Sequence, residues 1–134
     1  MLRGMSTVSY WTTDLPAARQ WYTDLLGIEP YFEVPDAYLE FRIGDYQHEL
    51  GLIDSRYAPA GTSTGQAAAG GEIVYWHVDD VQGTLDRLLF LGAREHQPPT
   101  DRGHGFVTAS VIDPFGSILG IMVNPHYLDV LGGR

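Results

Sequence analysis

The stretch EIVYWHVDDVQGTLDRLLFLGARE, residues 72–95, repeats the pattern of TVSYWTTDLPAARQWYTDLLGIEP, residues 7–30. Each begins with a short run of β-branched and aromatic residues that contains Tyr-Trp, a composition typical of a strand. Each then has an aspartate at the position of a helix N-cap, about three turns of apolar residues at helical spacing, and a glycine that ends the helix. The chain therefore contains one strand–helix unit written twice.

Each unit is followed by three segments that resemble strands. After the first helix these are PYFEV (30–34), AYLEFRI (37–43) and HELGLI (48–53). After the second helix they are AREHQPPT (93–100), FVTASVI (106–112) and SILGIMV (117–123). The prolines of AREHQPPT indicate a strand at the edge of its sheet. The pattern predicts an α+β fold made of two βαβββ modules.

The length of 134 residues fits a single domain. We expect module one to span about 5–54 and module two about 72–124. The small polar residues of 55–71 predict a linker between them. The polar tail, 125–134, is expected to add one short helical turn.

The charge of the chain argues against polyanionic partners. The formal net charge is −9, and the eight Lys and Arg residues are scattered, so we expect neither nucleic acid nor an anionic membrane surface as a partner. The absence of cysteine excludes disulfides and thiol catalysis, and no apolar run reaches the roughly 20 residues of a membrane span. We expect a cytoplasmic protein.

The alignment of the two modules decides which side chains face which way. Aligning Asp14-Leu15 with Asp80-Val81 directs Val8, Tyr10 and Thr12, with Val74, Trp76 and Val78, toward the helices. The opposite face then carries Thr7, Ser9 and Trp11 in module one, and Ile73, Tyr75 and His77 in module two. A slip of one residue would exchange the two faces.

The doubled βαβββ order, the phrase DLPAARQWYTDLLGIEPYF (14–32) and the phrase DPFGSILGIMV (113–123) resemble the vicinal oxygen chelate superfamily. Glyoxalases, bleomycin-resistance proteins and extradiol dioxygenases belong to it. The resemblance covers nearly the whole chain. It implies that the modules form curved mixed sheets around a concave site.

Catalytic members of that superfamily hold a divalent metal with four side chains, one from the first and one from the last strand of each module. Transferred to this sequence, the four positions fall on Thr7, Glu49, Ile73 and Gly120. Only Glu49 is a good metal ligand, so we expect no metal cofactor. His48 would replace Glu49 if its strand were shifted by one residue. Leu50 and Leu52 would then leave the helix-facing side, at roughly 1.5–3 kcal/mol each.

Two functions from different classes follow. The first is a metal-free protein that sequesters a planar aromatic or hydrophobic ligand, with Trp11, Tyr75 and His77 on one wall. The other expected ligand-binding residues are Ser9, Glu49, Ile73, Met122 and Gly120, whose missing side chain should leave a hollow. The second is a divergent glyoxalase- or dioxygenase-like enzyme, a lyase, isomerase or ring-cleaving oxygenase. It would act through Glu49 and a divalent metal, held by Glu49 or His48 with His77, or use Glu49 as a general base near His77 without a metal. We also expect a homodimer, because small half-barrels leave edges to cover.

Overall fold

A computed structural model describes residues 1–62, 64 and 72–133. The chain divides into two compact units, Met1–Gly65 and Gln66–Arg134, and each is described here by itself as module one and module two. Part of the expected linker, residues 63 and 65–71, lies outside the described residues. No helix among the described residues is long and apolar enough to cross a membrane.

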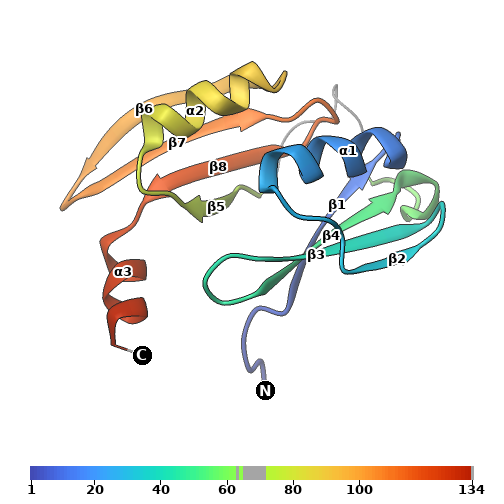
Figure 1. The fold of residues 1–134 in the computed structure, drawn as a ribbon, viewed down its shortest axis with the longest axis horizontal. Coiled ribbons are helices and arrows are strands. Elements are labelled where there is room, and N and C mark those ends of the chain that lie inside the picture. Colours follow the sequence, from blue (N-terminus) through green and yellow to red (C-terminus); the bar gives the residue numbers. More distant parts are fainter. Residues whose placement is uncertain (63, 65–71, 134) are drawn as a thin grey trace. The chain divides into compact units, whose positions relative to one another are not determined.

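The two modules have the same order of elements and the same sheet topology (Figure 1). The sheets run β1-β4-β3-β2 and β5-β8-β7-β6, and in each the first strand pairs in parallel with the last. The predicted α+β fold of two mixed sheets is confirmed. The elements of module one are β1 (Thr7–Thr12), α1 (Leu15–Leu26), β2 (Phe32–Val34), β3 (Tyr38–Ile43), β4 (His48–Asp54) and the 3-10 turn η1 (Ser55–Tyr57). Those of module two are β5 (Val74–His77), α2 (Val81–Phe90), β6 (Arg94–Gly103), β7 (Phe106–Ile112), β8 (Ile118–Val123) and α3 (Pro125–Gly132).

Both long helices begin at the aspartates that the sequence indicates. The Asp14 side chain accepts a hydrogen bond from the backbone N–H of Ala17 at 3.1 Å, and α1 ends at Gly27 in the left-handed conformation. Of the two aspartates before α2, Asp80 is the cap and accepts from the Gly83 N–H at 3.0 Å.

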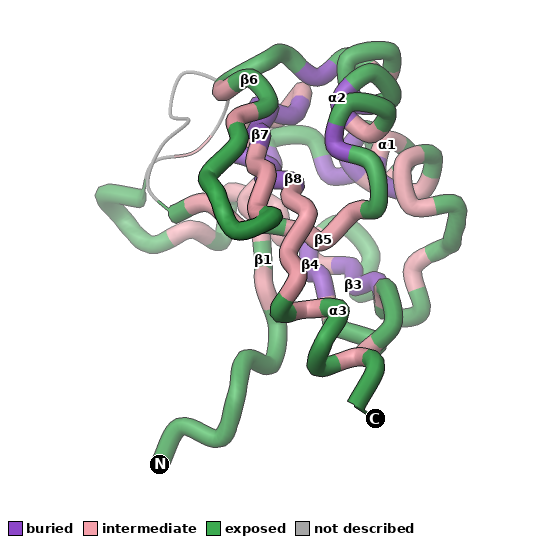
Figure 2. The backbone as a smooth tube through the Cα atoms, turned by 90° about the vertical axis from the view of Figure 1, so that its left-hand side faces the viewer, coloured by how far each residue is buried: buried purple, intermediate pink, exposed green. Residues whose placement is uncertain are grey.

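The predicted alignment of the two faces is confirmed by the strand pairing. In module one, Val8 and Tyr10 pair with Leu50 and Leu52, which are buried where α1 packs on β4. In module two, Val74 and Trp76 likewise pair with the buried residues Leu119 and Ile121, where α2 packs on β8. Because side chains alternate along a strand, Thr7, Ser9 and Trp11, like Tyr75 and His77, lie on the faces away from these helices. Figure 2 shows the buried segments on the inner sides of the helices and in the adjoining strands.

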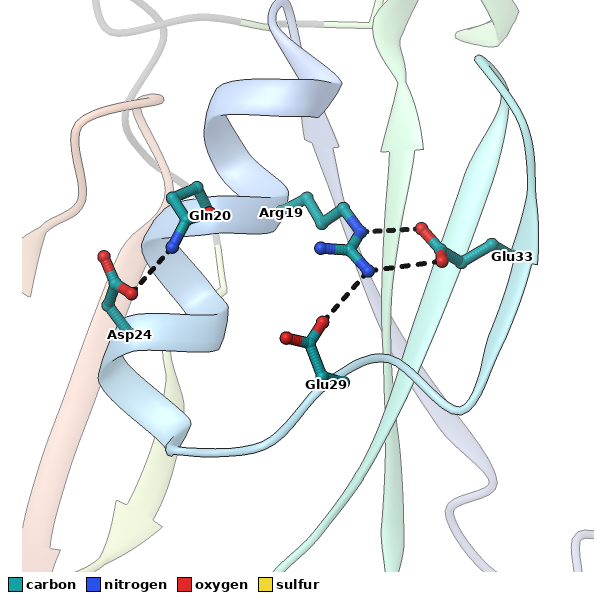
Figure 3. Close-up of polar contacts among 5 residues, drawn as sticks. All are labelled: Arg19, Gln20, Asp24, Glu29 and Glu33. Carbon is teal, nitrogen blue, oxygen red and sulfur yellow. Dashed lines mark hydrogen bonds and ion pairs between the residues drawn. The ribbon is translucent and has the colours of Figure 1, made fainter.

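Two acidic residues that follow α1 form ion pairs with an arginine of that helix. Arg19 binds Glu33 of β2 through Nε at 2.8 Å, and Glu29 through Nη2 at 3.0 Å (Figure 3). Its guanidinium lowers the pKa of Glu33. This bridge joins α1 to the short outermost strand of its sheet and to the loop that leads into it.

The C-terminal tail forms more structure than expected. Instead of one turn it forms α3, an eight-residue helix. Asn124 is its N-cap and accepts the backbone N–H of Tyr127 at 3.2 Å, and Pro125 follows in the first turn. The expectation rested on the polar character of the tail, whereas the Asn124 cap and Pro125 in the first turn are sufficient to start a longer helix.

Two residues of α2 test the assignment of its packed face. Leu88 is 1 % exposed and Phe90 is 80 % exposed. Leu88→Ala should lower the free energy of unfolding by about 2–5 kcal/mol, because it leaves a cavity under the helix. Phe90→Ala should change it by less than about 0.5 kcal/mol. Urea denaturation of both variants measures the difference, and equal losses would contradict the assigned face.

Candidate functional site

The face of module one that points away from α1 carries a connected set of polar side chains. We call it the polar face and define it by Thr7, Ser9, Tyr31, Tyr38, Glu40, Arg42 and Glu49. Glu49 lies beside Thr7, its partner in the parallel pairing of β1 and β4, and Oε1 accepts the Thr7 hydroxyl at 3.1 Å. Glu49 and not His48 therefore lies on this face. His48 is exposed and stacks on Tyr46, with ring centroids 5.7 Å apart.

The centre of the polar face is a pair of carboxylates linked by a tyrosine. The Tyr31 hydroxyl contacts Glu49 Oε2 at 2.7 Å and also contacts Glu40. Tyr38 donates a second hydroxyl to Glu40, which is buried. Arg42 places its guanidinium over the Tyr31 ring, 4.1 Å from the centroid. One cation and three hydroxyl groups thus surround two acidic side chains.

These contacts raise the pKa values of the two tyrosine hydroxyls and lower the pKa of the Glu49 carboxyl. The hydrogen bond to Glu40 raises the pKa of Tyr31 to about 12, and the contact with Glu49 adds to the shift. Burial raises the pKa of Tyr38, and its bond to Glu40 acts in the same direction. Hydrogen bonds from Tyr31 and Thr7 lower the pKa of Glu49. At neutral pH the face therefore presents an ionised carboxylate held by protonated phenols.

Four members of this face, Tyr31, Tyr38, Glu40 and Arg42, were not among the predicted site residues. A signal for three of them is present in the sequence. In AYLEFRI, Leu39 and Phe41 are buried, so the alternating positions Tyr38, Glu40 and Arg42 must lie on the other face. Tyr31 could not be found this way, because it precedes β2 and reaches Glu40 through the pairing of β2 with β3.

In module two the corresponding face is aromatic. Tyr75 is partly exposed, and its ring lies over Gly120, its pairing partner in β8. A Cβ added at Gly120 would come within 2.6 Å of the Tyr75 ring and 2.8 Å of the Ile73 side chain. The expectation of a hollow at Gly120 is therefore wrong, because these neighbouring side chains already take the space that the missing side chain leaves.

His77 and Met122 are neighbours in the pairing of β5 with β8. The His77 ring is stacked on Tyr127 of α3, with centroids 4.7 Å apart and planes 11° from parallel. Trp11 and Ser9 belong to module one, where Ser9 lies over Gly51 as Tyr75 lies over Gly120. The predicted residues thus form two sets, one in each module. Their binding of a ligand stays a prediction.

The four positions at which the resemblance implies metal ligands do not suit a metal. The Thr7 hydroxyl is bound to Glu49, whose oxygens are shared between Thr7 and Tyr31. Ile73 is apolar, and a side chain at residue 120 would clash with the Tyr75 ring. Within the described ranges, no group of three or more His, Asp or Glu could hold a metal ion. Among these four positions Glu49 is the one carboxylate, and a single carboxylate is too few ligands for a catalytic metal.

The hydrogen bonds at Tyr31 can be tested by titration. Tyr31 should lose its proton near pH 12 instead of at its ordinary pKa of 10.0. Because the folded pKa is raised, its contribution to stability is complete below pH 10.0 and is lost as the pH rises through about 12. Tyrosinate absorbance, taken as the difference between wild type and Tyr31→Phe, measures the value. Glu40→Gln should bring it down, and an unshifted titration would contradict the described network.

Comparisons with known proteins agree with the topology. The chain resembles a glyoxalase-related enzyme from Fulvimarina pelagi, with 23% identity, a TM-score of 0.74 and coverage of 92% of this chain and 90% of that one. It also resembles lactoylglutathione lyase from Agrobacterium tumefaciens, with 20% identity, a TM-score of 0.70 and coverage of 95% and 98%. The fosfomycin resistance protein FosX from Listeria monocytogenes, solved with Mn(II) and sulfate, has 12% identity, a TM-score of 0.73 and full coverage of both chains.

At these identities the solved structures show the fold alone. A search of curated proteins found no match. The family is shown by a sequence model, which matches residues 4–121. With its two βαβββ modules and that match over most of its length, the chain belongs to the glyoxalase/bleomycin resistance protein/dioxygenase superfamily.

Proposed function

We propose that this protein binds a planar aromatic or hydrophobic small molecule without a metal, and sequesters it. The observation that carries the proposal is at Gly120, where the Tyr75 ring and the Ile73 side chain lie over the position of a metal ligand in catalytic relatives. An aromatic surface thus replaces a metal-binding side chain. The superfamily includes both resistance proteins and enzymes, and this replacement favours binding over metal chemistry.

The aromatic side chains supply the contacts that such a ligand needs. Trp11 in module one and Tyr75 in module two are both partly exposed on the faces away from the helices. Planar rings stack on such side chains, at about 0.5–1.5 kcal/mol per pair beyond the buried area. Ser9, Met122 and His77 complete the set of proposed ligand-binding residues.

Glu49 offers the ligand a negatively charged hydrogen-bond acceptor. Its carboxylate has a lowered pKa and lies beside the Tyr31 hydroxyl, so it stays ionised at neutral pH. A hydrogen-bond donor or a cationic group on the ligand would pair with it, and the negative net charge of the chain favours the approach of cations.

Ligand binding is tested by fluorescence titration with a set of planar aromatic compounds that are cationic, neutral or anionic. A bound compound should quench Trp11. Trp11→Ala should weaken its binding by about 1–2 kcal/mol, because a stacking contact and buried area are lost. Trp76→Phe, on the face toward α2, is the matched control and should bind as the wild type does. Loss of binding in the Trp76 variant alone would contradict the proposed face.

Metal content is tested by elemental analysis of purified protein. Because one carboxylate cannot hold a catalytic ion, zinc, nickel, manganese and iron should be far below one equivalent. A stoichiometric metal that is lost in Glu49→Ala would overturn the proposal. It would favour the enzyme, with Glu49 as a metal ligand.

A further inference from the structure

The strand β6 is the outer strand in the sheet of module two (Figure 1), and it separates its charged residues between the two faces of that sheet. Its two acids, Glu95 and Asp101, pair with Val111 and Val107 of β7. Val111 is buried where α2 packs on β7, and Val107 shares its face because side chains alternate along a strand. Both acids therefore lie on the α2 side of β6.

Two basic side chains of β6, those of His96 and Arg102, lie on the other face. His96 Nδ1 is 2.8 Å from Ser110 Oγ, and Arg102 donates through Nε to Thr108 Oγ1 at 3.0 Å. Ser110 and Thr108 flank the buried Ala109 in β7, so both lie on the face away from α2. Two hydroxyl groups of β7 thus hold two basic side chains of the neighbouring strand.

Both basic residues lie at interruptions in the pairing of β6 with β7. One interruption spans 95–97, with His96 at its centre, and another spans 101–103, with Arg102 at its centre. Such irregularities redirect side chains and are frequent beside functional sites. The irregular backbone of β6 therefore coincides with the two side chains that reach over β7.

The guanidinium of Arg102 is available to an anion. Thr108 engages its Nε, and among the described residues it forms no ion pair with a carboxylate. Arg19 and Arg56 of module one, in contrast, are both paired with acids. A guanidinium binds a carboxylate through two parallel hydrogen bonds, and the two terminal nitrogens of Arg102 can supply them.

The strands of module two place no carboxylate on the face that carries Arg102. The described strand residues on this face are basic, aromatic, apolar or hydroxyl-bearing, and they include Tyr75, His77, His96, Arg102, Thr108, Ser110 and Met122. Asp79, whose Oδ1 is 3.7 Å from His77 Nε2, follows β5, at the opposite edge of the sheet from β6. The β6 side of this face is therefore locally basic in a chain whose net charge is −9.

We propose that module two binds the carboxylate of a planar aromatic acid through Arg102, with the ring of the ligand on Tyr75. The Tyr75 ring lies over Gly120 and is 38% exposed, so a second ring can stack on it. β8 separates β5 from β7, so Tyr75 and Thr108 belong to strands roughly 10 Å apart. A bicyclic aromatic acid spans such a distance. The inference rests on the proposed function and adds the anionic group of the ligand, which the Glu49 carboxylate would repel.

The test compares three compounds of one shape: 2-naphthoate, which is anionic, 2-naphthamide, which is neutral, and 2-naphthamidine, which is cationic. Isothermal titration calorimetry measures their dissociation constants. Wild type should bind 2-naphthoate about tenfold or more tightly than 2-naphthamide, because the bonds to the guanidinium are charge-assisted. Arg102→Gln should remove this difference and leave the binding of 2-naphthamide unchanged. Arg102→Lys should restore only part of it, because an ammonium lacks the planar fork.

Arg87→Gln is the matched control, since it removes the same charge from an exposed position of α2. It should bind 2-naphthoate as the wild type does, and an equal loss in both variants would reduce the effect to net charge and overturn the inference. Tyr75→Ala should weaken 2-naphthoate and 2-naphthamide by the same factor. In wild type, the NMR resonance of the Arg102 Nε–H should move with 2-naphthoate and stay in place with 2-naphthamide. This measurement decides the point even if Arg102→Gln does not fold.

The failure of the inference can be told apart from the failure of the proposed function. If 2-naphthamide or 2-naphthamidine binds and 2-naphthoate binds no more tightly than 2-naphthamide, the inference is overturned and the proposed function stands. The same holds if 2-naphthoate binds wild type and Arg102→Gln equally. If none of the three compounds and none of the planar compounds tested with Trp11 binds, both proposals fail.

Discussion

Side chains alternate between the two faces of a strand, and in each module the parallel pairing of the first and last strands carries this alternation across the sheet. Leu50 and Leu52 in one module, and Leu119 and Ile121 in the other, must lie toward the helices because burial of their apolar surface stabilises the fold. The side chains at the neighbouring positions in these strands therefore lie on the opposite face of the sheet. The polar face and the aromatic face are thus consequences of how the core is packed.

The elements that are defined by local chemistry were predictable from the sequence. Asp14, Asp80 and Gly27 mark helix ends because their side chain or backbone conformation satisfies helix termini directly. Contacts that depend on strand pairing were harder. Tyr31 reaches Glu40 only because β2 folds back on β3, and Tyr75 covers Gly120 only because their strands pair in that register. The hollow expected at Gly120 was wrong for this reason: a missing side chain was treated as empty space without its neighbours.

The internal repeat shows which residues of the two modules occupy equivalent positions. Ser9 lies over Gly51 as Tyr75 lies over Gly120, so a glycine occupies the same place in both modules. Glu49 precedes Leu50, the partner of Val8, as Ile118 precedes Leu119, the partner of Val74. In this strand pairing the residue of module two that corresponds to Glu49 is Ile118, two residues before Gly120, which is the position that the resemblance implies. The two modules share one backbone plan, but one carries carboxylates and hydroxyl groups where the other carries apolar and aromatic groups.

The outer strand of the second sheet has a consequence for the behaviour of the protein at high concentration. β6 pairs with β7 through three interruptions of register, and Pro98 and Pro99 lie within the second of them, between Gln97 and Thr100. Proline has no N–H to offer to an additional strand, and an irregular backbone cannot form a continuous ladder with another chain. This margin of the sheet is therefore protected against growth into fibrils, even though the strand spans ten residues. Replacing both prolines would restore the backbone N–H groups at these positions and remove part of that protection.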